Sequence, residues 1–503
     1  MSIVTFEFLF FLFASLIVFY LFPKKYRWLV LLGASIYFFV KACSWKLGLY
    51  LISGIIITYV GARIIDERCK KQKTKKITLI ITLFGIVSQL FMLKYVNIFP
   101  LTGNMFLSVF DMDLQFGTFN FIAPLGISYY TLSLISYVVD VYWTTCKAEK
   151  NILKYALFAC YYPSMISGPI IRYPQMKDEF FNEKKLDWNN IYQGFYRILY
   201  GLMKKLVIAD ALSAIVTKVF GNYEVYNSIF IIYGVICYAI QIYCDFSGCM
   251  DIIIGASKMY GVKLPENFDS PFFSKNLSEF WRRWHISLGL WGKDYIMYPL
   301  LKSSLFQNFG KKCKKIFGKK TGKKIPTITA ILILWLFIGL WHGASYKYIF
   351  AAGILPWIYL AVGELFSDIP EKLNKLLHIN TKCFSFRLFQ SIRTFLFMCL
   401  VWLFVCGEHL KDFFKIVKNI FKLPDINIKA NLALSHPVVI VLMLVLVFIV
   451  DLLNYKKINA IEKFQEQNFL FRWIFMLIII SVILLCGCYG PNYSAVDFIY
   501  GGF

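Results

Sequence analysis

Long apolar runs alternate with short polar connections along this chain. The runs that approach the roughly 20 apolar residues needed to cross a bilayer are 3–22, 28–40, 77–93, 226–243, 327–341, 388–407, 437–454 and 469–486. Reading hydropathy along the whole sequence, we expect about 11 or 12 spans. The pattern predicts an all-α polytopic integral membrane protein in which residues 1–503 form a single membrane domain.

Two polar stretches interrupt this pattern where the flanking chain is apolar. The first, 266–299, holds a run of tryptophans, arginines and a histidine: Trp281, Arg282, Arg283, Trp284 and His285. The second places Trp341 and His342 inside the apolar run 326–352. A charge at membrane depth costs several kcal/mol unless it is paired or lines a wet cavity. Both stretches are therefore candidate functional sites.

Residues 279–294 have a spacing that suits one helix. One face of this helix would then be polar. It would carry residues at i, i+3, i+7 and i+10, which are Arg282, His285, Gly289 and Gly292. The two glycines would then let a neighbouring backbone or a thin acyl chain approach His285. We expect Pro299 to end this element, after Asp294.

Other segments are predicted to depart from a simple spanning helix. Residues 160–175 contain three prolines, and an interior proline removes a donor and clashes with the preceding turn, so a broken helix is expected. Residues 191–209 place Arg197, Lys204 and Lys205 among apolar residues, which favours a position at the membrane interface.

Two acidic residues, Asp245 and Asp251, lie in the apolar run that starts at 226. They are expected either to pair with neighbouring arginines or lysines, or to line the entrance of a polar cavity. The residue types alone leave both alternatives open.

Composition strengthens the membrane interpretation. The chain is 58% hydrophobic and only 17% charged, with a formal net charge of +25. In a membrane protein the excess of Lys and Arg marks cytoplasmic loops, so we do not expect a nucleic-acid partner. The alternation of basic and non-basic connections places the N-terminus outside and 63–76 in the cytoplasm. Residues 1–22 lack a basic start and a cleavage site, so they are interpreted as a retained span.

The most basic stretch is 301–325, which carries nine lysines. A solvated cytoplasmic loop that touches anionic lipid is the first interpretation. The alternative is an electrostatic platform for an acidic acyl carrier protein or for the phosphates of coenzyme A.

The two membrane histidines, His285 and His342, limit the chemistry. A neutral imidazole can accept a proton from a hydroxyl near pH 7, as a general base does in acyl transfer. A histidine that only packs inside a span is the competing interpretation. The sequence has no G-x-S-x-G, H-E-x-x-H or P-loop motif and no visible set of metal ligands. These residues alone therefore indicate a membrane enzyme or transporter with a histidine-lined polar cavity, without a metal.

Several motifs resemble one family. They are GPIIRYPQ at 168–175, YCDFSGCMDIIIG at 243–255, ENFDSPFFSKNLSEFWRRWHISL at 266–288, KDYIMYPL at 293–300 and GLWHGAS at 339–345. Together they resemble the membrane-bound O-acyltransferase (MBOAT) family, and within it the alginate O-acetyltransferase branch.

The resemblance implies a fold and a site. The fold is a ring of about 11 or 12 spans with broken or re-entrant helices around a central tunnel, and the catalytic core falls within 121–366. His342 corresponds to the catalytic histidine of the family, and His285 to its partner. Arg282 and Asp294 would position the donor or support His342, Arg283 would stabilise the oxyanion, and Trp341 would support the site.

The resemblance also implies a function. The protein would move an acetyl group from a cytoplasmic thioester, acetyl-CoA, across a bacterial cell membrane for O-acetylation of an exported or cell-surface polysaccharide. No bound cofactor is expected, and an extracytoplasmic acetyltransferase would complete the transfer. The alternative within the family is D-alanyl transfer to teichoic acid from an acyl carrier protein. The alternative in another class is a proton-coupled transporter or flippase.

Overall fold

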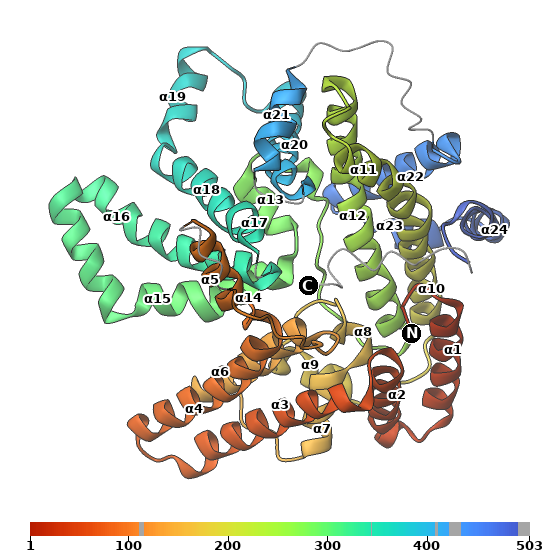
Figure 1. Ribbon diagram of the computed structural model, residues 1–503. Helices are drawn as coiled ribbons and strands as arrows, with labels where there is room; N and C mark the ends of the chain where they lie inside the picture. Colours follow the sequence, from red (N-terminus) through yellow and green to blue (C-terminus); the bar gives the residue numbers. More distant parts are fainter. Residues whose placement is uncertain (110–114, 344, 408–410, 422–433, 491–503) are drawn as a thin grey trace. The chain divides into compact units, whose positions relative to one another are not determined.

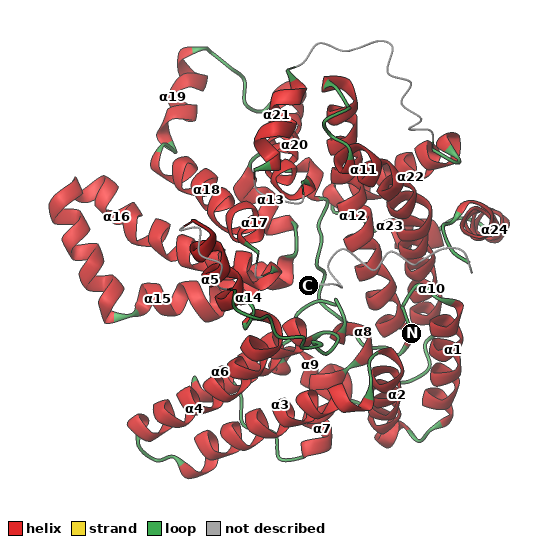
Figure 2. Cartoon of the chain, in the orientation of Figure 1, coloured by secondary structure: helices red, strands yellow, loops and turns green. Residues whose placement is uncertain are grey.

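The chain is helical through most of its described length (Figures 1 and 2). The computed structural model describes residues 1–109, 115–343, 345–407, 411–421 and 434–490. Within these ranges the single β-type pairing is an isolated antiparallel bridge between Phe268 and Trp284. The prediction of an all-α protein is confirmed.

Eight helical stretches in the described chain are long and apolar enough to cross a membrane: Trp45–Arg68, Gln72–Tyr95, Ser228–Met259, Ser304–His342, Tyr346–Leu365, Phe384–Cys406, Pro437–Tyr455 and Phe469–Cys486. They make the chain a multi-pass membrane protein. The sequence predicted 11 or 12 spans, and two of the apolar runs expected to cross, 3–22 and 28–40, form shorter helices. The apolar helix α1 (Phe6–Leu21) and α2 (Arg27–Ala42) have 16 residues each, about 24 Å of rise against a hydrocarbon core of about 30 Å.

By internal packing the chain divides into two compact units. Among the described residues, the first holds Met1–Leu199 and Cys249–Glu266, and the second holds Tyr200–Gly248 and the chain from Asn267 to Gly490. Two of the boundaries fall inside helices, in α10 (Trp188–Leu202) and α12 (Ser228–Met259), and the one between Glu266 and Asn267 falls in a loop.

The first unit contains α1 and α2 and continues with helices of very different lengths. These are α3 (Trp45–Arg63), α4 (Gln72–Leu90), α5 (Ile98–Val109), α6 (Ile127–Tyr142), α7 (Ile152–Cys160), α8 (Tyr162–Met165) and α9 (Tyr173–Phe181). Helices α3, α4 and α6 pack on one another (Figure 1). Small residues allow this approach, since a methyl group at Gly54 would meet Ile86 at 2.9 Å and one at Gly61 would meet Thr82 at 2.2 Å.

The proline-rich stretch 160–175 is broken, as predicted. Helix α7 ends at Cys160, the single turn α8 follows, and α9 begins only at Tyr173. The start of α6 packs against this break. Gly126 has φ 74°, and a methyl group there would lie 2.1 Å from the carbonyl oxygen of Met165, so only glycine fits.

The second unit contains the remaining helices. These are α11 (Asp210–Gly221), α13 (Leu277–Arg283), α14 (Ile286–Gly292), α15 (Tyr298–Lys302), α16 (Ser304–His342), α17 (Tyr346–Ile349), α18 (Leu355–Leu365), α19 (Asp368–Leu376), α20 (Phe384–Cys406), α21 (Asp412–Ile420), α22 (Pro437–Tyr455), α23 (Ala460–Gln465) and α24 (Phe469–Cys486). Helices α10 and α11 are joined by the π-helical turn η4 (Met203–Ala209).

The lysines of η4 are buried inside the protein, so their charges do not require the interfacial position predicted for 191–209, and that position stays a prediction. Lys204 is 3% exposed and Lys205 is 1% exposed. Lys205 forms ion pairs with Asp245 at 2.6 Å and Asp210 at 2.9 Å, and these carboxylates compensate for its loss of water. In the first unit Asp251 pairs with Arg197 at 2.9 Å. Of the two alternatives for Asp245 and Asp251, pairing with a basic residue is confirmed.

Candidate active site

The WRRWH segment is folded around a break in the helix, and the prediction of one helix over 279–294 is wrong. Helix α13 ends at Arg283 and α14 begins at Ile286. Between them Trp284 is extended and His285 has φ 47°, in the left-handed region. Arg282 and His285 therefore do not share a helical face. A left-handed backbone costs about 1–2 kcal/mol for a residue with a side chain, so the surroundings must hold it in place.

A short antiparallel pairing is the physical reason for the break. Phe268 and Trp284 form the isolated bridge. On one side of it the amide of Asp269 donates to the carbonyl of Arg283 at 3.0 Å. On the other side the amide of Ile286 donates to the carbonyl of Asn267 at 3.0 Å. These bonds draw residues 283–286 away from helical geometry and place His285 beside Asn267.

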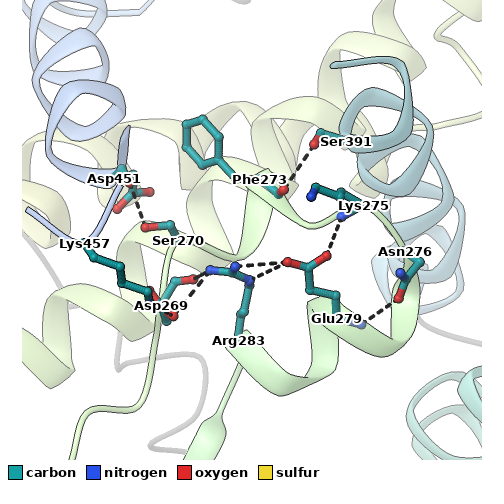
Figure 3. A network of polar contacts seen from close by, with 10 residues as sticks. All are labelled: Asp269, Ser270, Phe273, Lys275, Asn276, Glu279, Arg283, Ser391, Asp451 and Lys457. Atoms are coloured by element: carbon teal, nitrogen blue, oxygen red, sulfur yellow. Dashed lines mark hydrogen bonds and ion pairs between the residues drawn. The ribbon is translucent and has the colours of Figure 1, made fainter. Parts of the chain in front are cut away.

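A polar network secures this loop from outside (Figure 3). The guanidinium of Arg283 pairs with Glu279 at 3.0 Å and with Asp269 at 3.3 Å, and Asp269 also pairs with Lys457 at 2.9 Å. The hydroxyl of Ser270 donates to the carbonyl of Asp451 in α22 at 2.8 Å. The guanidinium of Arg283 is thus held by the carboxylates of Asp269 and Glu279. Its expected role in stabilising the oxyanion stays a prediction.

The other residues predicted to support the site lie on either side of α14. Arg282 is exposed, and one of its nitrogens donates to the hydroxyl of Ser278 at 3.1 Å. Asp294 is half-buried in the π-helical turn η6 (Lys293–Met297), which follows α14 directly. Burial and, second, Arg282 lower the pKa of Lys293.

Pro299 does not end the element, contrary to expectation. It lies in the first turn of α15, which follows the π-helical turn η6 directly. The helical run therefore continues past Asp294.

His285 lies in an aromatic enclosure. It is 4% exposed, and its ring is edge-on to Phe246 at 4.8 Å and to Trp341 at 5.7 Å between centroids. Its Nδ1 is 3.3 Å from Oδ1 of Asn267. Burial lowers the pKa of His285 well below its usual 6.5, and His342 lowers it further. The imidazole is therefore neutral near pH 7, as a general base requires.

His342 is the last residue of α16 and is 9% exposed. The ring of Trp341 lies 5.1 Å from the ring of His342 and 5.7 Å from that of His285. The structure thus brings His285, Trp341 and His342, which the sequence singled out, into one cluster of the second unit.

Most of the glycines near the histidines are in close contact with other parts of the protein. A methyl group at Gly339 would lie 3.1 Å from the backbone of Tyr348 and Ile349, and one at Gly292 would lie 2.3 Å from Leu334. Gly292 therefore does not leave space for an acyl chain beside His285. At Gly289 the nearest atom to such a methyl group is a carbonyl oxygen at 3.8 Å, so this position can admit a neighbour.

The lysine-rich stretch is helical, which corrects its interpretation as a loop. Helix α16 contains one non-helical residue, Gly318, with φ 78° and ψ 168°. The chain reverses there, since a methyl group at Gly322 would lie 2.5 Å from Cys313 and one at Gly310 would lie 3.3 Å from Pro326. We call residues 304–326 the basic hairpin; its second arm continues directly to His342.

Sequence reasoning missed Asn267, which is 0% exposed and touches His285. Its place in the ENFDSP motif was the only signal, because nothing local indicates that the chain folds back on 283–286. Among the described residues there is no group of three or more His, Cys, Asp or Glu side chains placed to hold a metal ion. The absence of a metal stays a prediction.

Comparison with known proteins gives consistent similarities. Residues 147–312 match the MBOAT, membrane-bound O-acyltransferase family. The chain is 32% identical over 335 residues to a probable alginate O-acetylase AlgI of Azotobacter vinelandii, covering 66% of this chain and 62% of that protein. The homologous protein of Pseudomonas aeruginosa is 30% identical over 426 residues, covering 82% and 74%. A peptidoglycan O-acetyltransferase of Helicobacter pylori is 29% identical over 436 residues, covering 81% and 75%.

Proposed function

Because this chain belongs to the membrane-bound O-acyltransferase family, we propose that it transfers an acetyl group from a cytoplasmic thioester toward a hydroxyl of an exported or cell-surface polysaccharide. Relatives named for O-acetylation of alginate and of peptidoglycan support this acceptor class. The structural observation that carries the proposal is the cluster of two buried imidazoles, His285 and His342, on the shared ring of Trp341.

In the proposed reaction, His342 accepts the proton of the acceptor hydroxyl. The oxygen attacks the thioester carbonyl, the carbon–sulfur bond breaks, and the leaving thiolate takes up the proton that His342 had accepted. His285 lies next to this group and assists it as a second neutral imidazole. Arg282 and Asp294 are proposed to position the donor or to support His342. We assign Arg283 first to holding the loop, because two carboxylates engage it. This machinery falls within 121–366.

We propose acetyl-CoA as the donor and the basic hairpin as the surface that attracts its phosphates. Six exposed lysines of the hairpin make no ion pair with a described residue: Lys311, Lys312, Lys314, Lys315, Lys319 and Lys323. Replacing Lys311, Lys312 and Lys314 by Gln should raise the KM for acetyl-CoA several-fold at low salt, and less at high salt. The same change at Lys73, Lys75 and Lys76 is the control. An unchanged KM would mean that these lysines do not bind the donor and would favour their contact with anionic lipid.

An extracytoplasmic acetyltransferase is the proposed partner that completes transfer to the polysaccharide. The partner is proposed from the chemistry alone: the donor is cytoplasmic and the acceptor is exported, so a second protein is expected on the far side. Loss of polysaccharide acetate without such a protein, while membranes still consume acetyl-CoA, would support this division.

The test of the function is base-released acetate and D-alanine from the cell envelope and the exported polysaccharide. We compare wild type, a deletion, His342→Ala, and His436→Ala as a control at an exposed histidine. Acetate should disappear in the deletion and in His342→Ala and persist in the control, with His342→Ala present in the membrane at wild-type level.

Other outcomes would redirect the assignment. Loss of D-alanine instead of acetate would move the protein to the teichoic-acid branch of the family. Wild-type acetate in His342→Ala would remove His342 from the mechanism. If neither product changes in the deletion, the proposed transfer is wrong.

A further inference from the structure

The loop that carries His285 has a second buried polar residue that the proposed reaction has not used. Asn267 is fully buried, and its carbonyl accepts from the amide of Ile286 at 3.0 Å. This hydrogen bond fixes the position of the Asn267 backbone, from which its side chain extends. The side-chain amide then lies among three groups that can donate to it.

The orientation of that amide follows from its partners. Its Oδ1 accepts from the backbone amide of Ser287 at 3.0 Å and from the hydroxyl of Ser287 at 2.9 Å. A backbone N–H can only donate, so the atom of the Asn267 side chain that faces it must be the oxygen and not the nitrogen. The usual ambiguity between the two ends of an asparagine amide is therefore removed here.

The same oxygen sets the proton position on the imidazole. Nδ1 of His285 is 3.3 Å from Oδ1 of Asn267. Since this oxygen can only accept, the Nδ1 beside it is the protonated nitrogen. A neutral imidazole with its proton on Nδ1 has its lone pair on Nε2.

We propose that Asn267 is a positioning residue that holds His285 as the Nδ1–H tautomer, so that Nε2 is the nitrogen available to the reacting groups. This inference rests on the proposed acyl transfer for its catalytic consequence, but the tautomer itself does not. Asn267 touches the imidazole and not the substrate, so it acts only through His285.

Two features of the surroundings make a fixed tautomer useful. Phe246 and Trp341 enclose the ring edge-on, so the imidazole cannot readily turn over to exchange its nitrogens. The lowered pKa keeps the ring neutral, and only a neutral ring has two distinct nitrogens. The neighbouring His342 is a titratable group that lowers this pKa further.

The kinetic test uses the full-length protein with Asn267→Ala and Asn267→Asp. Asn267→Ala should lower kcat for acetyl transfer about 10- to 100-fold. Removing the hydrogen-bond partner of a metal-bound histidine has an effect of this size on activity. A carboxylate at this position also accepts from Nδ1 and favours the protonated ring. Asn267→Asp should therefore recover much of kcat and shift the acid limb of the pH profile upward.

The matched control is Asn419→Ala. Asn419 is 5% exposed and donates from its amide to the carbonyl of Tyr223 at 2.8 Å, so it is an equally buried asparagine outside the histidine cluster. Its kcat and pH profile should stay within about twofold of wild type. Equal losses in Asn267→Ala and Asn267→Asp with an unchanged pH profile would show a merely structural role and overturn the proposal. A wild-type kcat and profile in Asn267→Ala would do the same.

The tautomer is read independently of activity. ¹⁵N NMR of the purified protein labelled at its five histidines separates protonated from unprotonated ring nitrogens, and His285→Gln identifies the signal. A protonated Nδ1 with an unprotonated Nε2 is expected, and the opposite tautomer would overturn the inference even in an active enzyme. The expected tautomer in a wild type that transfers no acetyl group would instead refute only the proposed function.

Discussion

At the scale of single residues, the site depends on one backbone conformation. His285 is held at φ 47° between α13 and α14 by the pairing of 267–269 with 283–286. The same pairing buries its ring against Asn267, Phe246 and Trp341. His285 therefore combines a strained backbone with a buried, hydrogen-bonded side chain, as is common at active sites.

This burial predicts a pH dependence of stability. Burial and, second, His342 lower the pKa of His285 below 6.5, so the unfolded chain binds a proton at pH values where the folded protein does not. The free energy of unfolding therefore falls as pH drops below about 6.5, by at most about 1.4 kcal/mol per pH unit. Thermal unfolding between pH 7.5 and 5 should show a steeper loss for wild type than for His285→Gln. Parallel curves would mean that His285 titrates normally.

At the scale of elements, close helix contacts set the position of His342. Helix α16 approaches α17 and the following π-helical turn η7 (Phe350–Ile354) at Gly339, where a methyl group would lie 3.1 Å from Tyr348, Ile349 and Gly353. Three backbone contacts at this distance leave no side chain that could move aside. The end of α16 is thus fixed one turn before its histidine.

Enlarging Gly339 should disturb both stability and activity. Gly339→Val should lower the free energy of unfolding by about 1–3 kcal/mol and reduce acetyl transfer, because it displaces the end of α16. Gly363→Ala is the control, since no atom lies within 4 Å of the added carbon in α18 and alanine favours a helix. Thermal unfolding and activity of purified protein measure both. A Gly339→Val protein as stable as wild type would contradict the contact.

The sequence predicted the elements better than the bends between them. Apolar length and the prolines of 160–175 were sufficient for most of the spans and for the broken segment, because both are local properties. The break at His285 was not predictable, since it depends on a pairing with residues distant in the chain. The burial of Lys205 was missed for the same reason: its partners Asp210 and Asp245 meet it only in the folded protein. The two histidines were found because each stands out from an apolar background.

At the scale of the molecule, buried charges are paired inside the second unit. Lys205, Asp210 and Asp245 lie together at 1%, 6% and 2% exposure. The amide of Cys488 donates to the carbonyl of Leu206 at 2.9 Å, which ties the end of α24 to the turn that carries Lys205. Segments separated by more than half of the chain therefore depend on one polar cluster.

Removing the cation of this cluster should destabilise the protein. Lys205→Met leaves two buried carboxylates without this lysine, and loss of one partner of a buried pair costs about 3–5 kcal/mol. Combining it with Asp210→Asn and Asp245→Asn should recover much of the loss. The exposed pair of Lys415 and Glu224 supplies the control, because Lys415→Met should cost less than about 1 kcal/mol. Thermal unfolding in detergent measures each variant, and a small effect of Lys205→Met would contradict the importance of this pairing.

The basic hairpin has a consequence for how the chain could be made. The chain runs from His285 to the exposed Gly318, reverses its direction there and continues to His342. The two arms pack on each other around Cys313 and Gly322, so the covalent bond at the reversal is not what holds them together. Two polypeptides divided at Gly318, each bringing one histidine, should then assemble into an active enzyme when they are produced in the same cell.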